Sequence, residues 1–264
     1  MDLVKILAKK WIAGNTLEDA LLYCKKLREE GIYSIVNFLS EQLVEEELID
    51  KTMGEYSNAI ERLDPEYASI AVKLTQIGLK RSKEEAESRL KGLLDRAEER
   101  SIQVWIDMEE KEYIEPTLEI YESCRRKGLG ICIQSYLERS KSDIERLCRI
   151  GAEIRLVKGA YTGEGYENRK DATKNYYFLL DYLFEHAEKF TVATHDKKII
   201  EYAIKRNDEM KKDITFAMLK GVKEGLAKSL AKSHKVAIYV PYGPGWLPYA
   251  LRRIKEGSLL RLLI

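Results

Sequence analysis

The sequence predicts an α/β fold, a (β/α)8 TIM-like barrel preceded by a helical segment. Three observations lead to this prediction. Eight short, β-branched apolar runs occur along the chain, amphipathic charged segments lie between them, and the connections are short. Strands that alternate with helices form parallel sheets, and eight such units close into a barrel of about 250 residues. The chain has 264 residues.

Each predicted strand is followed by a segment of helical texture. The strands are expected at Ser34–Leu39, Ser69–Leu74, Gln103–Asp107, Gly130–Gln134, Glu153–Lys158, Phe190–His195, Ile214–Leu219 and Lys235–Val240. Apolar residues at three- and four-residue spacing predict amphipathic helices at Glu84–Arg100 and Asp171–Glu188. An open, doubly wound sheet is the alternative, but no early G-x-G-x-x-G motif supports a dinucleotide-binding half.

The domain organisation follows from the absence of a linker. Residues 1–31 are helical in texture, and we expect them to cap the bottom of the barrel or to pack on its side. No Pro/Gly/Ser-rich tract divides the remaining chain. Residues 32–264 are therefore predicted to form one barrel domain.

Charge and composition exclude several classes of protein. The 45 basic residues nearly balance the 44 acidic ones, so no overall field favours nucleic acid. The four cysteines show no metal-binding spacing and are expected to be reduced thiols of a cytoplasmic protein. No apolar run approaches the ~18 residues of a transmembrane helix. The apolar tail Ser258–Ile264 could be a packing segment, an oligomer contact or a peripheral contact with the inner face of the membrane.

Polar residues stand at nearly every predicted strand end. In a barrel these ends meet around one opening. The residues at these ends, all polar except Leu219, are Glu41, Lys73, Asp107, Gln134, Lys158, His195, Leu219 and Tyr239. Each could simply mark where a strand leaves the core, but their repeated occurrence favours a site, and their mixed charges suit a zwitterion. His195 is the one histidine at a strand end, and one histidine does not make a metal site, so no metal is expected.

The last predicted helix adds two arginines to this end of the barrel. Pro248 suits its first turn, and Tyr249, Arg252 and Arg253 then lie close to one face. Adjacent arginines can present several donors to a carboxylate or a phosphate. A solvated basic pair is the ordinary alternative, but the preceding Gly-Pro-Gly-Trp-Leu-Pro-Tyr stretch is too apolar for a surface turn.

Three motifs carry a family resemblance. They are Arg155-Leu-Val-Lys-Gly-Ala-Tyr161, Val192-Ala-Thr-His-Asp196, and the stretch from Tyr239-Val-Pro-Tyr-Gly to Tyr249-x-x-Arg-Arg253. In this order the chain resembles the proline dehydrogenase family, flavin-dependent (β/α)8 enzymes that oxidise L-proline. The resemblance extends roughly from Ile32 to Glu256. It implies oxidation of L-proline to Δ1-pyrroline-5-carboxylate as the first step of proline catabolism, with electrons passed to a quinone or another acceptor.

The resemblance also implies which residues hold the flavin. It would lie across the fourth to sixth strands. The positions that match flavin contacts of the family are Gln134, Arg155, Val157, Lys158, Gly159, Tyr161, Thr194 and His195. A cation such as Arg155 beside the ring would stabilise reduced, anionic flavin, which gives Arg155 a catalytic role.

By the same resemblance, proline would lie between the flavin and the last helix. Lys73, Arg252 and Arg253 would hold its carboxylate and are expected to be both catalytic and substrate-binding. The other substrate-site positions are Asp107, Leu219, Tyr239 and Glu41. The first three would line the ring, and the last would pair with the first arginine of the helix and close the site.

One departure from the family affects the cofactor. Larger members carry an aromatic residue after G-A-Y that helps to hold the adenine, whereas this chain has Thr162 followed by Gly163. FAD is therefore expected, with FMN as the alternative. Two other functions stay open: a Schiff-base aldolase that uses Lys158 or Lys73, and a flavin-binding subunit of a larger dehydrogenase.

Overall fold

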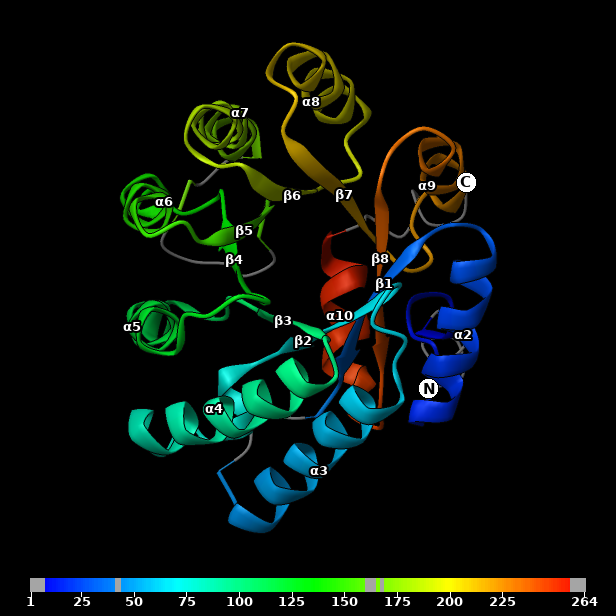
Figure 1. The fold of residues 1–264 in the computed structure, drawn as a ribbon, viewed down its shortest axis with the longest axis vertical. Coiled ribbons are helices and arrows are strands. Elements are labelled where there is room, and N and C mark those ends of the chain that lie inside the picture. The colour runs from blue at the N-terminus through cyan, green and yellow to red at the C-terminus, as the bar shows by residue number, and fades with distance from the viewer. Residues whose placement is uncertain (1–7, 41–43, 160–164, 167–168, 257–264) are drawn as a thin grey trace.

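Eight parallel strands form a closed barrel, and helices surround it (Figure 1). The computed structural model describes residues 8–40, 44–159, 165–166 and 169–256. Strands adjacent in the chain pair in parallel, and β8 closes the sheet on β1 with Ile35 opposite Tyr239. The predicted fold class is confirmed.

Each strand overlaps its predicted range. The strands are β1 (Tyr33–Phe38), β2 (Ala68–Val72), β3 (Gln103–Ile106), β4 (Leu129–Gln134), β5 (Glu153–Val157), β6 (Lys189–Ala193), β7 (Asp213–Leu219) and β8 (Val236–Tyr242). Strand β2 ends two residues earlier than predicted, because a 3-10 turn begins directly after Lys73. Strand β8 continues two residues further than predicted, because its last residues still pair with β1.

The helices alternate with the strands as expected. They are α2 (Leu17–Glu29), α3 (Glu46–Arg62), α4 (Lys83–Glu99), α5 (Ile114–Cys124), α6 (Ser140–Arg149), α7 (Arg169–His186), α8 (Lys197–Met210), α9 (Glu224–Ala231) and α10 (Trp246–Glu256), with 3-10 turns η1 (Leu74–Ile77) and η2 (Lys111–Tyr113). The two amphipathic helices predicted from spacing correspond to α4 and α7, each within two residues at either end.

Two separate cores support the barrel. The larger one lies between the strands and the helices, whereas a small one fills the barrel interior around Trp105 and small residues such as Ala71 and Ala237. The indole needs this room. A Cβ on Gly130 would lie 2.5 Å from the Trp105 ring, so only glycine fits opposite it. The interior is therefore filled by side chains up to the layer that carries the polar site.

The helical N-terminal segment packs on the side of the barrel. Helix α2 contacts β1 and β8 and lies between α3 and α9, as Figure 1 shows. Ion pairs join it to both neighbours: Glu18 to Arg62 at 2.6 Å and Glu30 to Lys228 at 2.7 Å. Helix α10, which follows β8, instead lies over the carboxyl ends of the strands. Trp11 and Ile12 pack in one cluster with α10.

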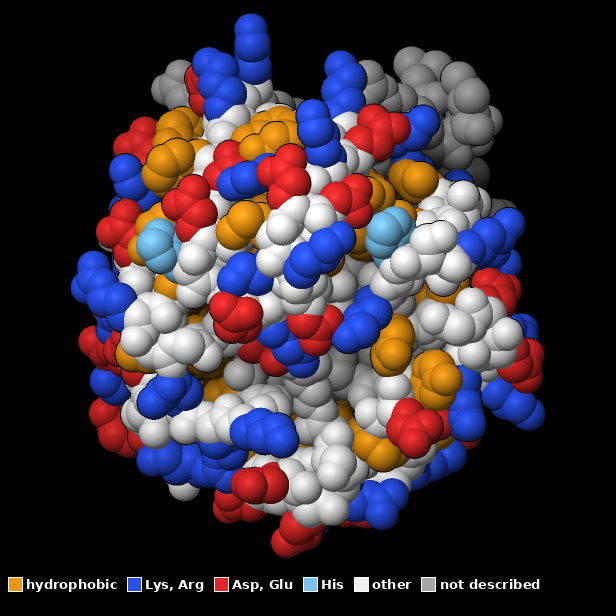
Figure 2. Space-filling view, turned by 45° about the horizontal axis from the view of Figure 1, so that its top comes forward, with side chains coloured by type: hydrophobic (Ala, Val, Ile, Leu, Met, Phe, Trp, Pro, Cys, Tyr) orange, Lys and Arg blue, Asp and Glu red, His pale blue; other side chains and the backbone are white. Residues whose placement is uncertain are grey.

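The surface reflects the balanced composition. On the face in Figure 2, basic and acidic side chains alternate, with hydrophobic side chains scattered between them. The cysteines are free thiols. In the part of the chain that the structure describes, we find no helix with the length and apolarity to cross a bilayer.

Candidate functional site

Asp107 is the centre of the polar layer at the carboxyl ends of the strands. It follows β3 and is buried. Lys73 Nζ, from the end of β2, lies 2.8 Å from Asp107 Oδ2, and the Tyr239 hydroxyl, from β8, donates to the same oxygen at 2.5 Å. Arg155, from β5, donates to Oδ1. Three residues predicted from separate strand ends and Arg155, predicted from the family resemblance, thus form one hydrogen-bonded group.

The charges of this group compensate one another. Burial alone would raise the pKa of Asp107, but the charges of Lys73 and Arg155 and the hydrogen bonds from Lys73 and Tyr239 hold it below its usual value. Asp107 is therefore a carboxylate that offsets two cations. Burial, followed by the charge of Asp107, raises the pKa of Tyr239 well above its usual value, so Tyr239 stays a protonated donor.

Arg155 is held inside the barrel by aromatic rings as well as by its ion pair. Its guanidinium carbon lies 5.1 Å from the centroid of Trp105 and 5.5 Å from that of Tyr239. The side chain is buried, and Nη1 has no hydrogen-bond partner among the described residues. The Cys132 thiol also lies beside this guanidinium, but a thiol is only a weak acceptor, so the donor can still serve a ligand.

A cavity of about 250 Å³ lies between α10 and the ends of β1 to β3. Its lining includes Lys73 and Arg252, two of the three cations predicted to bind the carboxylate of the substrate. The full lining is Leu39, Ser40, Lys73, Thr75, Gln76, Glu109, Gly245, Pro248, Tyr249 and Arg252. Arg253 does not line this cavity; its guanidinium carbon lies 5.4 Å from the ring of Tyr249, which does.

The predicted flavin side lies around the ends of β4 and β5. Gln134 is buried, and its Nε2 donates to the main-chain oxygen of Glu109 at 3.0 Å. Its Oε1 has no partner among the described residues and is left as an acceptor. Gly159 has φ +105°, and a Cβ there would lie 2.2 Å from the Tyr136 ring, so this position requires glycine. Val157 is half-buried at the end of β5.

Lys158 and Thr194 turn toward the start of α8. Lys158 Nζ lies 3.2 Å from Asp196 Oδ2 and 3.3 Å from the Thr173 hydroxyl. The Thr194 hydroxyl accepts a hydrogen bond from the main-chain N–H of Asp196 at 3.1 Å. These bonds fix the loop between β6 and α8, and the next residue along, His195, is fixed with it.

His195 is neutral, with a defined tautomer. Its Nε2 accepts a hydrogen bond from the main-chain N–H of Leu219, at the end of β7, at 2.9 Å. The ring proton is therefore on Nδ1, which remains a donor. Burial, and then the charges of Arg253 and Lys223, lower the pKa of His195 to about 4. Leu219 is half-buried, and this bond joins its main chain to the ring of His195.

We expect His195 to make the protein less stable as pH falls. Its pKa drops from 6.5 to about 4 on folding, so the unfolded chain binds more protons between these values. Stability should therefore decrease through this window, by at most roughly 3 kcal/mol. In His195→Gln, whose Oε1 can still accept from Leu219, urea unfolding should depend less on pH. Parallel pH profiles for the two proteins would contradict this.

Two predicted site residues, Glu41 and Tyr161, lie outside the described residues. Residues that the sequence analysis did not assign to the site include Thr75, Gln76 and Glu109, which line the cavity, and Trp105 beneath Arg155. Inward orientation in a strand could have indicated Trp105. The other three lie in stretches that take part in the resemblance, Val72–Gln76 and Ile106–Glu110, but they were given no role, because their partners lie on other strand ends.

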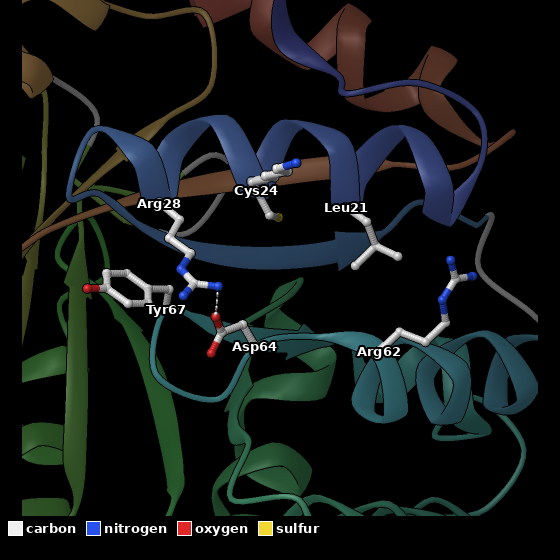
Figure 3. Close-up of a pocket in the computed structure, with 7 residues that line it drawn as sticks. Leu21, Cys24, Arg28, Arg62, Asp64 and Tyr67 are labelled. Atoms are coloured by element: carbon white, nitrogen blue, oxygen red, sulfur yellow. Dashed lines mark ion pairs between the residues drawn. The ribbon is translucent and has the colours of Figure 1, made fainter.

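A larger cavity, of about 380 Å³, lies between α2 and the end of α3 (Figure 3). Its arginines are satisfied within the chain: Arg28 pairs with Asp64 at 2.7 Å, and Arg62 pairs with Glu18 at 2.6 Å. None of the predicted site residues lines it. Size alone therefore does not identify the site, and the smaller cavity under α10 is the one with the relevant chemistry.

The arrangement argues against a Schiff-base enzyme. Lys73 and Lys158 are each ion-paired with an aspartate. A Schiff-base lysine must present an uncharged amine to a carbonyl, and an adjacent carboxylate opposes this. Among the described residues, we find no group of three or more His, Cys, Asp or Glu side chains that could hold a metal ion.

Comparisons with known proteins identify the family. The family model for proline dehydrogenase matches residues 20–259. Proline dehydrogenase 1 of Bacillus subtilis subsp. natto is 32% identical, with 94% of this chain and 86% of that protein covered. Proline dehydrogenase of Deinococcus radiodurans is 30% identical, with 95% and 86% covered.

Solved structures share the fold. Proline utilization A from Bdellovibrio bacteriovorus, inactivated by N-propargylglycine, matches 97% of this chain with a TM-score of 0.88 and 22% identity. Proline utilization A from Corynebacterium freiburgense matches 99% of the chain with a TM-score of 0.84 and 18% identity. This chain spans about a third of the length of those two proteins, 33% and 32%.

Proposed function

The chain belongs to the proline dehydrogenase family, and from that premise we propose that it oxidises L-proline to Δ1-pyrroline-5-carboxylate with a bound flavin. This is the first step of proline catabolism. The observation that carries the proposal is the joining of Lys73, Asp107, Arg155 and Tyr239 into one buried group beside a cavity that Arg252 also lines.

The cavity suits a small amino acid with a carboxylate. Lys73 and Arg252 bring two cations to it, and Arg253 lies one residue further along the same helix. We propose that these three hold the carboxylate of proline, as the family resemblance implies. Asp107 offsets part of their positive charge. The empty site therefore carries less unbalanced charge, while the remaining cations can still bind an anion.

The proline ring would contact the less polar part of the site. We propose that Leu219 and Tyr239 cover it, and that Glu41 pairs with Arg252 and closes the opening. Excluding water in this way would strengthen the charge interactions and hold the C5 hydrogen toward the flavin. No described side chain is assigned as a general base, and the amine of proline could lose its proton to water.

The residues at the ends of β4 and β5 fit a flavin. Gln134 Oε1 and Arg155 Nη1 are a buried acceptor and a buried donor that lack partners within the described chain. The chemistry that a flavin supplies when bound is acceptance of the hydride from proline C5. Arg155 would stabilise the negative charge that this transfer brings to the ring. The remaining proposed contacts are Val157, Lys158, Gly159, Tyr161, Thr194 and His195.

We propose FAD as the flavin and a quinone as the electron acceptor. The adenine end of the dinucleotide would lie beyond Tyr161, where Thr162 and Gly163 replace the aromatic residue of larger members. FMN has the same isoalloxazine ring but no adenine. It is therefore the alternative, because the proposed contacts to the ring would be the same.

A visible absorption spectrum tests the proposal. Purified protein should carry noncovalent flavin, and acid release followed by chromatography should identify FAD or FMN. Under anaerobic conditions L-proline should bleach the flavin, whereas pyrrolidine, which lacks the carboxylate, should do so poorly, by roughly 10- to 150-fold in affinity per lost charged contact. Protein that neither holds nor binds flavin would refute the assignment. Equal bleaching by both compounds would refute the carboxylate clamp.

A further inference from the structure

The turn that follows Lys73 is fixed by fully buried polar side chains. Turn η1 directly follows Lys73, and its two polar residues, Thr75 and Gln76, are 0% and 2% exposed. Polar groups at this depth are stable only when they are hydrogen-bonded. Their partners therefore determine where the turn, and the lysine before it, can lie.

Glu109 satisfies both donors of Thr75. The main-chain N–H of Thr75 donates to Glu109 Oε1 at 3.1 Å, and its hydroxyl donates to Oε2 at 2.6 Å. Glu109 is 2% exposed and lies two residues after Asp107. Burial raises the pKa of Glu109 more than Lys73 and Thr75 lower it. This buried carboxyl lines the cavity, and the proposed function gives it no role.

Gln76 ties the other side of the turn to β1. Its Nε2 donates to the main-chain oxygens of Phe38 at 3.3 Å and Ser40 at 3.2 Å. Its Oε1 accepts from the Tyr56 hydroxyl at 2.5 Å. The turn is thus held from both neighbouring strands. On the β3 side, Glu109 accepts both of the hydrogen bonds that Thr75 donates.

We propose that Glu109 is a positioning residue of the carboxylate site. By accepting both hydrogen bonds of Thr75 it fixes turn η1, and through the turn it holds Lys73 beside Asp107 and in the wall of the cavity. The inference rests on the proposed function, since Lys73 matters only if it holds the carboxylate of proline. Gln134 bonds the main-chain oxygen of Glu109, so a change of the Glu109 side chain should leave that bond intact.

Glu109→Met tests the side chain at nearly constant length. It removes both acceptors, so the KM for L-proline should rise about 10-fold, within the roughly 10- to 150-fold expected for loss of the Lys73 contact itself. The kcat and the flavin content should stay near wild type. Glu109→Gln should keep both bonds, because its oxygen can accept from the N–H and its amide can donate to the hydroxyl of Thr75. Its KM should stay within about 3-fold of wild type.

A second measurement avoids turnover. The Kd of cyclopentanecarboxylate, a ring carboxylate without an oxidisable amine, should follow the same order in calorimetric titrations of the flavin-loaded protein. Thr75→Val loses only the hydroxyl bond and should raise both constants about 3-fold; it decides the matter if Glu109→Met does not fold. Glu112→Met is the matched control, since it removes an exposed acid of η2 and should change neither constant.

The outcomes separate this inference from the proposed function. Raised KM and Kd in Glu109→Met and Thr75→Val, with recovery in Glu109→Gln, would support it. Unchanged constants in the first two variants would overturn it. An equal rise of KM and Kd in Glu109→Gln and Glu109→Met would also overturn it, because the charge of Glu109 would then matter and not its bonds to Thr75. Wild-type protein that L-proline fails to bleach would instead refute the proposed function.

Discussion

Replacing Arg155 by methionine should lower the reduction potential of the bound flavin and slow its reduction even at saturating L-proline. The guanidinium is buried, and its Nη1 is without a partner among the described residues. A hydrogen bond to a charged group contributes roughly 1.5–3 kcal/mol. For a two-electron couple this corresponds to a fall of roughly 30–65 mV, and a similar loss in the barrier would slow reduction by roughly 10- to 150-fold.

Stopped-flow reduction and potentiometry would measure both effects. Arg155→Lys is the matched control, because it keeps the charge that Asp107 requires while losing the planar fork. Its potential should lie between the other two. If Arg155→Met instead changes only the KM for proline and leaves the potential unaltered, Arg155 belongs to the substrate and not to the flavin. Thermal unfolding of each variant is needed as well, since removing one member of a buried ion pair destabilises a protein by roughly 3–5 kcal/mol.

The barrel could be predicted because its pattern is local and repeated. Each strand is a short β-branched run whose side chains are buried on both faces, as in Ala68–Val72, where every residue is buried. The helices between strands carry a periodic apolar face. The prediction of the strands also gave the positions of their ends. Lys73, Asp107 and Tyr239 were predicted there, and they meet in the structure.

The supporting residues could not be predicted in this way. Thr75 and Glu109 are 34 residues apart, and Gln76 and the Phe38 carbonyl are 38 apart. The sequence Leu74-Thr-Gln-Ile77 is equally consistent with an ordinary exposed turn. Its polar side chains are buried because three strand ends converge on it, and convergence is a property of the closed sheet.

The position of α2 also depended on the whole barrel. An amphipathic helix before the first strand can pack at several places, and both the bottom and the side were expected. The side is available because α10 leaves the ring of helices and covers the strand ends, where Tyr249 and Arg252 line the cavity. Helix α2 then covers β1 and β8, which would otherwise expose their outer faces. One displaced helix thus explains both the site and the place of the N-terminal segment.

Replacing Arg253 by methionine should raise the KM for L-proline steeply and leave the flavin potential near wild type. Arg253 projects from α10, and its guanidinium carbon lies 5.4 Å from the centroid of the Tyr249 ring. Loss of one charged contact to the carboxylate should weaken proline binding by roughly 10- to 150-fold. Steady-state kinetics, flavin content and potentiometry on the same preparation would measure the three quantities.

Arg252→Met is the matched comparison, since it removes the neighbouring guanidinium that lines the cavity itself. It should raise the KM in the same way. The two variants should differ at His195, whose pKa of about 4 is lowered by burial and then by Arg253. That pKa should rise in Arg253→Met and not in Arg252→Met, and NMR titration can follow it because the chain has only three histidines. If Arg253→Met shifts the potential while Arg155→Met only weakens proline binding, the roles of the two arginines are reversed, because the cation nearer the flavin would then come from α10 and not from β5.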